Sequence, residues 1–464
     1  SAWLRPSQDL GSKRVSRGAG DGFNAEAERT PLGAWWMLAV LLLFYVLSIN
    51  DRLILSMLVA PMKADLHLSD VQVGLIMGPA FAICYALAGV PLGWASDRFP
   101  RRWVIFLGVS AWSLFAAGSG VARTFLSLFL CRVGVGIGEA ALTPAAYSLM
   151  ADKFPRRRLT LAMSIYQMGS MVGSAGAFAL GGMIIGFATA LGPIDLPLLH
   201  ELKPWHLVLI LTGAPGVIVA GLAFTFSEPA RRGADVLKPK SHRSLFAFAL
   251  AEWRLLLPMA LGFSLVVMCA NTMVAWVPTF MTRQFGWSPV QYGPALGAVS
   301  IVASSTMIVK GWLVDLLYAR GVRDAHLRFY TWILGISIPL ALGLFWIPQP
   351  MLFLIAYAAL QAIAMQFVVY VAATVQLVTP LDLRGQVIAA FVSLFSVVGL
   401  GLGPLLTAML TDYLFRDEAK LGASLALVTG VAIPLAFIFL RIALRPVHAA
   451  MAREATIVAD PAVA

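Results

Sequence analysis

The chain has 464 residues, of which 59% are hydrophobic and 12% are charged. Soluble domains carry about 25% charged residues, so this composition excludes an ordinary soluble domain. Apolar windows of about 20 residues recur along the whole length, which is typical of a helical protein that crosses a membrane many times. The net charge of +11 is also compatible with nucleic-acid binding, but its distribution along the chain indicates another cause.

Twelve apolar segments follow one another, and each is long enough to span the hydrocarbon core of a bilayer as a helix. Their predicted bounds are 34–60, 71–95, 103–122, 124–150, 159–189, 205–226, 255–282, 289–317, 327–347, 350–378, 385–411 and 423–444. We therefore expect an all-α membrane protein with twelve transmembrane helices in two six-helix bundles. An even number of spans places both termini on one side of the membrane.

The basic residues indicate which side this is. Of the 34 Lys and Arg residues, 25 fall in segments on the side of the termini, 6 fall in loops on the other side and 3 fall inside spans. Cytoplasmic segments of membrane proteins carry an excess of Lys and Arg. We therefore expect both termini in the cytoplasm and the chain in the inner membrane of a bacterium. The same bias explains the net charge without a nucleic-acid partner.

One long polar segment divides the spans into two groups of six. The predicted parts are a cytoplasmic tail at 1–33, an N-terminal bundle at 34–226, a cytoplasmic linker at 227–254, a C-terminal bundle at 255–444 and a second cytoplasmic tail at 445–464. The second part of the linker, around 244–253, favours a short amphipathic helix on the membrane surface.

The two groups of spans repeat each other. Asn50 corresponds to Asn271 at an offset of 221. Gly93-Trp94-x-x-Asp97 corresponds to Gly311-Trp312-x-x-Asp315 at an offset of 218, and the pair Arg158 and Gly173 corresponds to Arg384 and Gly399 at an offset of 226. Transporters are commonly built from such repeats, with the substrate site near the midplane where the repeats meet.

Four charged residues lie deep in the predicted spans of the first half: Asp51, Arg52, Arg132 and Glu139. Arg132 and Glu139 are seven residues apart, so on a helix they share one face, about 10 Å apart along the axis. Charges within hydrocarbon are costly and normally face a bundle interior or a water-filled cavity. We expect these four residues to form one neutral working site. The alternative is a static buried ion pair.

The charges suggest a division of roles. Burial disfavours the charged form of Glu139, whereas a nearby Arg132 favours it. The protonation of Glu139 therefore depends on its distance from Arg132 and on the access of water, both of which alternate in a transporter. We therefore expect Glu139 to carry the coupled proton, with Asp51 as the second candidate. Arg52 and Arg132 are expected to bind a polar head of the substrate.

Neutral polar residues and one lysine complete the set of candidates. Asn50, Asn271, Gln361 and Gln366 are expected to line the cavity, although for the two glutamines scattered hydrogen bonds between helices are equally compatible. Lys310 is expected to extend its ammonium to the cytoplasmic surface. The charges face an apolar counterpart in the second half, and a cavity with one charged and one apolar wall suits an amphipathic substrate.

No enzyme signature is found in the sequence. The six His residues lie in loops, tails or span edges without the spacing of a metal site. The phosphate-binding loop of ATP-driven proteins is also missing. We expect neither an enzyme nor a metal or other cofactor, and we expect a monomer.

The loop after the second span reads GWASDRFPRR, from Gly93 to Arg102. It resembles the signature loop of the major facilitator superfamily, G-x-x-x-D-R-x-G-R-R, with Pro100 where that family usually has Gly. Proline fixes φ, so the turn can differ from the family's. The resemblance implies that the loop, with Asp97, Arg98, Arg101 and Arg102, is a cytoplasmic gate. A plain charged turn is the alternative.

Three further motifs narrow the resemblance. NDR in the first span, RVGVGIGEA in the fourth and ADKFPRRR after it are together similar to the spinster branch of that superfamily. This resemblance implies proton-linked transport of lysolipids or sphingoid lipids, and it points to the same four charged residues. Two alternatives stay open. One is a proton-coupled carrier of a small organic anion, such as a sugar acid or drug, and the other is a lipid scramblase or channel without coupling.

Overall fold

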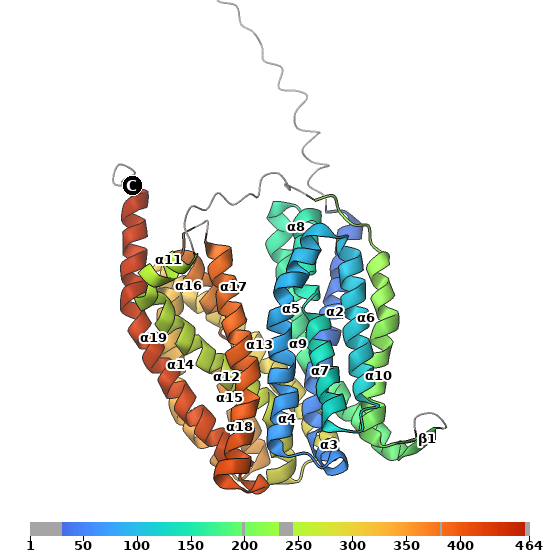
Figure 1. Cartoon of the computed structure of the whole chain (residues 1–464). Helices are drawn as coiled ribbons and strands as arrows, with labels where there is room; N and C mark the ends of the chain where they lie inside the picture. Colours follow the sequence, from blue (N-terminus) through green and yellow to red (C-terminus); the bar gives the residue numbers. More distant parts are fainter. Residues whose placement is uncertain (1–29, 197–199, 232–244, 381–382, 460–464) are drawn as a thin grey trace, which may run out of the picture.

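The computed structural model describes residues 30–196, 200–231, 245–380 and 383–459. In this part of the chain, 12 helices are long and apolar enough to cross a membrane, which confirms the predicted fold class. These spans are Leu32–Met57, Asp70–Arg98, Arg101–Ser119, Phe125–Lys153, Arg157–Leu191, Pro204–Phe224, Trp253–Phe285, Pro289–Ala319, Ala325–Trp346, Pro350–Val378, Arg384–Phe415 and Glu418–Met451. They form two bundles that lie side by side (Figure 1).

The first bundle is formed by the elements from α2 to η1. Its elements are α2 (Leu32–Met57), α3 (Val59–Leu66), α4 (Asp70–Met77), α5 (Pro79–Arg98), α6 (Arg101–Ser119), α7 (Phe125–Glu139), α8 (Leu142–Lys153), α9 (Arg156–Leu191), β1 (Ile194–Leu196), β2 (His200–Leu202), α10 (Pro204–Val219) and the 3-10 helix η1 (Ala220–Phe224). The two strands pair antiparallel, with Ile194 opposite Leu202.

The second bundle contains more interruptions. Its elements are α11 (Leu245–Ala251), α12 (Trp253–Phe285), α13 (Pro289–Ala319), α14 (Ala325–Gly343), η2 (Leu344–Trp346), α15 (Pro350–Ile363), α16 (Val368–Val378), α17 (Arg384–Phe395), the π-helix η3 (Ser396–Leu402), α18 (Gly403–Met409), the π-helix η4 (Leu410–Phe415), η5 (Glu418–Lys420) and α19 (Leu421–Ala459).

The composition of the spans explains these helices. A helix satisfies its own backbone hydrogen bonds, which is required in hydrocarbon, where water cannot satisfy them. Large apolar side chains such as Leu87, Val90 and Ile218 are exposed. So much exposed apolar surface would favour aggregation in water, but it is compatible with a surrounding membrane.

The molecule has two opposite faces, at the two ends of its spanning helices (Figure 1). The terminal face carries the start of α2 and the end of α19, and the hairpin face, opposite to it, carries α3 and the β1–β2 hairpin (Figure 1). The short helix expected near the end of the linker is present as α11, although Ser244 lies outside the described residues. Beyond the predicted end of the last span at 444, α19 continues as a helix to Ala459.

The two bundles touch most closely where glycines remove side chains. At Gly78, between α4 and α5, a Cβ atom would lie 2.4 Å from the carbonyl oxygen of Gly401 in η3. At Gly182 in α9, a Cβ atom would lie 2.4 Å from the carbonyl oxygen of Pro289 in α13. Only glycine permits this approach, so the bundles pack backbone to backbone at these two crossings.

Candidate functional site

The four predicted charges are brought together between α2 and α7. Asp51 and Arg52 lie in α2, and Arg132 and Glu139 lie in α7, so the four residues share one region of the first bundle. Asp51, Arg132 and Glu139 are buried, and the side chain of Arg52 is 26% exposed. These four residues are called the charged cluster below.

Glu139 is held by α2 and not by its own helix. Its Oε2 accepts hydrogen bonds from Ser48 Oγ at 2.7 Å and from Arg52 Nε at 2.6 Å. The other carboxylate oxygen, Oε1, is buried and has no hydrogen-bond partner in the structure. The guanidinium of Arg52 also lies 4.4 Å from the centre of the Phe81 ring, a cation–π contact. The expected partner of Glu139 was Arg132, and the structure shows Arg52 instead.

Arg132 is held more loosely than Arg52. Its Nη1 donates to the backbone carbonyl of Asp51 at 3.2 Å, and its buried Nε has no hydrogen-bond partner in the structure. The physical reason for the changed pairing is direction. Arg52 extends from a neighbouring helix toward Glu139, whereas Arg132 is separated from it by two turns of α7. Arg132 therefore keeps hydrogen-bonding capacity for another group.

A cavity adjoins the charged cluster. Its first chamber, of about 320 Å³, is lined by Arg52, Arg132 and Tyr45 from the first bundle, and by Asn271 and Pro404 from the second. The chamber therefore lies between the two bundles, where a repeat-built transporter places its substrate. Of the predicted polar contacts, Asn271 lines this chamber and Asn50 lines neither chamber.

A second chamber, of about 570 Å³, continues from the first. The two share four lining residues, namely Leu53, Ser170, Ser174 and Val274. The second chamber runs between α9 and α13, and it includes both predicted glutamines, Gln361 and Gln366. Its walls combine apolar residues with hydroxyl and amide groups.

The signature loop lies at the terminal face. Asp97 and Arg98 at the end of α5 are exposed, and Arg98 stacks on Trp94 with its guanidinium 4.4 Å from the ring centre. Pro100 precedes α6 with φ of −58° and does not prevent the turn. The structure places Asp97 where it faces no partner among the described residues.

Arg101 and Arg102 have a different environment from Asp97. Arg101 is buried and binds Glu228, Asp152 and the backbone carbonyl of Pro229. Arg102 lies 3.6 Å from the same Glu228. These contacts tie the start of α6 to α8 and to the first residues of the linker. They hold the first bundle together and do not cross to the second.

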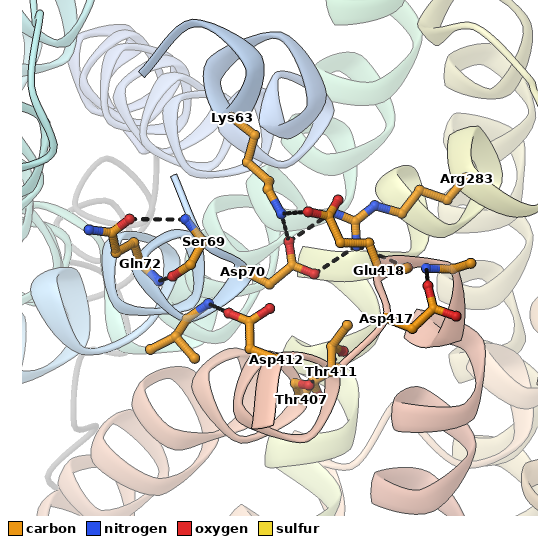
Figure 2. A network of polar contacts seen from close by, with 12 residues as sticks. Lys63, Ser69, Asp70, Gln72, Arg283, Thr407, Thr411, Asp412, Asp417 and Glu418 are labelled. Carbon is orange, nitrogen blue, oxygen red and sulfur yellow. Dashed lines mark hydrogen bonds and ion pairs between the residues drawn. The ribbon is translucent and has the colours of Figure 1, made fainter. Parts of the chain in front are cut away.

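The hairpin face has a network that the sequence analysis did not find. Figure 2 shows Asp70, at the start of α4, between Lys63 of α3 and Arg283 of α12. Arg283 donates to both oxygens of Asp70, at 2.7 and 2.8 Å, and Lys63 Nζ lies 2.6 Å from Asp70 Oδ1. Lys63 and Arg283 also reach Glu418 of η5. These four residues are called the hairpin-face network.

The network joins the two bundles. Lys63 and Asp70 belong to the first bundle, whereas Arg283 and Glu418 belong to the second. A further bond between the bundles runs from the backbone N–H of Val71 to Asp412 at 2.7 Å, and it caps the start of α4. Bidentate bonds of Arg to a buried carboxylate are among the stronger polar contacts. The hairpin face is therefore closed in this structure.

A second ion pair on the same face stays within one bundle. Asp65 of α3 accepts hydrogen bonds from Lys203 and from Trp205 Nε1. Burial alone would raise the pKa of Asp65, but the hydrogen bonds from Lys203 and Trp205 outweigh it and hold this pKa below its usual range. The pair connects α3 to the start of α10.

Among the described residues, no group of three or more His, Cys, Asp or Glu side chains is placed to hold a metal ion. The cavity walls offer arginine, hydroxyl and amide groups, and the carboxylates of Asp51 and Glu139 are buried in the adjoining charged cluster.

Comparison with known proteins decides the family. The family model described as Major Facilitator Superfamily matches residues 40–404. The chain belongs to this superfamily. An MFS-type efflux pump of Mycolicibacterium smegmatis is 28% identical, over 86% of this chain and 90% of that protein. A protein of Escherichia coli named as a probable L-galactonate transporter is 27% identical, over 67% of this chain and 68% of that protein.

A solved structure supports the narrower resemblance. The inward-facing, unoccupied structure of a bacterial homologue of the human lysosomal transporter spinster is 25% identical to this chain, with a TM-score of 0.73. The match covers 90% of this chain and 97% of that one. The resemblance to spinster proteins is therefore confirmed, and the protein is a multi-pass transporter of the major facilitator superfamily and not an enzyme.

Proposed function

We propose that this transporter is secondary active, works by alternating access, couples transport to protons, and moves an amphipathic lipid of the lysolipid or sphingoid type. The observation that carries the proposal is the position of the charged cluster. Arg52 and Arg132 line one end of a cavity between the bundles, and Arg52 is also the partner of the buried Glu139. An anionic group of the substrate and the Glu139 carboxylate therefore compete for the same arginine.

The coupling follows from this competition. While Arg52 binds Glu139, the carboxylate is stabilised in its charged form. An anionic group that enters the first chamber attracts Arg52 and weakens this pair, which favours protonation of Glu139. Proton and substrate then bias one conformational equilibrium, which is the thermodynamic requirement for coupled transport. Asp51, buried beside Arg132, is the second candidate for the proton.

The lining of the second chamber supports an amphipathic substrate. Met168, Met171 and Met307 line it together with Phe178. Methionine is unbranched and flexible, so it adapts to chains of variable shape. The polar head would lie between Arg52 and Arg132, and the apolar chain would follow the second chamber.

A specific observation favours a second candidate, a small polyhydroxylated acid. Ser300, Ser304 and Gln361 offer hydroxyl and amide groups in the second chamber, which suit a sugar acid better than a hydrocarbon chain. The similar Escherichia coli protein is named for L-galactonate. In this case one arginine would bind the carboxylate.

We propose further that the terminal face lies in the cytoplasm of a bacterial inner membrane. The excess of Lys and Arg in segments at this face supports it. With the hairpin face closed by its network, the structure then corresponds to an inward-facing state. Asp97, exposed at the terminal face, is proposed as a gate residue that acts when this face closes.

Transport by purified protein in liposomes tests the function. We expect a radiolabelled lysolipid to cross in a saturable manner and faster with a proton gradient, and we expect excess unlabelled lysolipid to compete where L-galactonate does not. Competition by galactonate alone would favour the sugar acid. Flux that is neither saturable nor sensitive to the gradient would favour a scramblase or channel and contradict the proposal.

A further inference from the structure

Lys310, in α13 of the second bundle, has an environment that neither the sequence nor the proposed function explains. It lies nine residues before the end of α13, about 14 Å along the helix from the terminal face. Its ammonium does not extend to that surface as expected. The residue is only 8% exposed, and its Nζ donates to the backbone carbonyl of Ala362 at 2.6 Å.

The acceptor marks a break in the tenth span. α15 ends at Ile363 and α16 begins at Val368, so the last carbonyl groups of α15 have no partner in their own helix. Lys310 binds the carbonyl of Ala362, and Tyr330 Oη binds that of Ala364 at 2.6 Å. Broken helices at membrane depth occur where they border a cavity.

The break has a counterpart in the first bundle. At the offset of 226 that relates Arg158 to Arg384, Glu139 corresponds to Met365 inside the break. The fourth span is also interrupted there, because α7 ends at Glu139 and α8 begins at Leu142. Each bundle therefore has an interrupted helix with a cation from a neighbouring helix, but only the first bundle supplies a carboxylate for it.

Lys310 thus remains a buried cation without an acidic partner among the described residues. An ammonium has three donors, and the structure shows one of them in use. The second chamber lies beside it, since Met307 precedes Lys310 by one turn and Gln361 is the neighbour of Ala362. Buried ionisable residues in membrane spans usually mark a substrate or ion pathway.

We propose that Lys310 is a second anion-binding site, through which the C-terminal bundle contacts an acidic group of the substrate, a carboxylate or a phosphate. The inference rests on the proposed function, because it concerns the same cavity. A substrate with an acidic group at Lys310, beside the second chamber, and another part at the arginines of the first chamber would connect the two bundles. Through such a bridge, binding of the substrate by one bundle influences the closure of the other bundle over the cavity.

Selectivity between an acid and its neutral analogue tests this site. The probes are monoacylglycerol phosphate against monoacylglycerol, and D-galactonate against galactitol, with affinity taken from the shift of Tm during titration. In Lys310→Met we expect the affinity for the acidic member to fall about tenfold or more, with little change for the neutral member. Lys310→Gln keeps a donor for the Ala362 carbonyl and should show the same loss with an intact fold.

The control is Arg320→Met, which removes an exposed cation from the end of the same helix and should leave both affinities unchanged. Equal losses for the acidic and the neutral probe, or no loss, would show that Lys310 only stabilises the break, and the proposal would be overturned. If no probe raises the Tm of the parent protein, the proposed function fails instead.

Access to the site is tested without any substrate. In a protein whose other cysteines are replaced, Lys310→Cys should react with a negatively charged, membrane-impermeant thiol reagent applied at the terminal face. A cysteine at position 310 that stays unmodified, while one at the cavity residue Ser304 reacts, would show that no anion reaches the site.

Discussion

The substitution Asp70→Asn should open the hairpin face. Asp70 has no solvent-exposed surface, and it accepts two hydrogen bonds from Arg283 and one from Lys63. The bonds from Arg283 exist only while the two bundles touch at this face. Asparagine keeps the size of the side chain but removes its charge. The substitution therefore lowers the stability of the closed state relative to the state that is open at this face.

The size of the effect follows from the geometry. Disrupting a buried, hydrogen-bonded charge pair costs about 2–5 kcal/mol. Asparagine retains one acceptor, so we take about 2 kcal/mol, which corresponds to about a thirtyfold change in the equilibrium between the two states. A protein that is open at the hairpin face about 1% of the time would then be open there about a quarter of the time.

Labelling of a cavity cysteine measures this shift. A cysteine at Ser174, which lines both chambers, is introduced after replacement of the three native cysteines. An impermeant thiol reagent is applied at the hairpin face, and we expect labelling to be many times faster in Asp70→Asn than in the parent.

The matched control is Asp65→Asn. Asp65 lies on the same face and is also paired with a lysine, but Lys203 belongs to the same bundle. Its loss should not change the labelling rate. Equal rates in all three proteins, or equal acceleration by both substitutions, would refute the assignment of the hairpin-face network as the closing contact.

Other substitutions give separate predictions. Arg132→Ala and Asp51→Asn should each reduce transport in liposomes by more than tenfold while membrane expression stays near that of the parent, and normal transport by both would exclude the charged cluster as the site. Asp97→Ala should change the accessibility of cysteines at the terminal face more than equilibrium binding of substrate, and the reverse would contradict its gate role. Because the folded-state pKa of Asp65 is lowered, its stabilising contribution is present above the unfolded pKa of about 4 and is lost as the pH falls through the folded value. The Tm of the parent should therefore fall more steeply below pH 4 than that of Asp65→Asn, and parallel curves would contradict this reading.

The fold was predictable because hydrophobic length is a strong signal. Twelve apolar segments and the excess of basic residues on one side determine a twelve-helix arrangement with little help from other features. The charged cluster was predictable for the same reason, since a charge such as Glu139 within an apolar run is conspicuous.

The pairings inside the cluster were not predictable. The spacing of Arg132 and Glu139 suggested a contact along one helix, but the structure shows Arg52 reaching across from α2. Contacts between helices depend on rotation and depth, which sequence spacing does not determine. Lys310 was misjudged for the same reason, because the break of the tenth span that receives its ammonium is not visible in the sequence pattern.

The hairpin-face network was missed because each member resembles an ordinary loop charge. Asp70 follows Ser69, which forms a capping box with Gln72, so its sequence context indicates only the start of a helix. Arg283 and Glu418 are distant in sequence and meet Asp70 only after both bundles have formed.

The response of Glu139→Gln transport to a proton gradient tests the central claim most directly. Glutamine has the shape of the protonated carboxyl and still accepts a hydrogen bond from Ser48, but it cannot exchange a proton or form an ion pair with Arg52. In proteoliposomes, the variant should exchange labelled for unlabelled substrate, with no acceleration by a pH gradient that accelerates the parent. If the gradient accelerates Glu139→Gln as much as the parent, then Glu139 does not carry the coupled proton and the account of coupling is wrong.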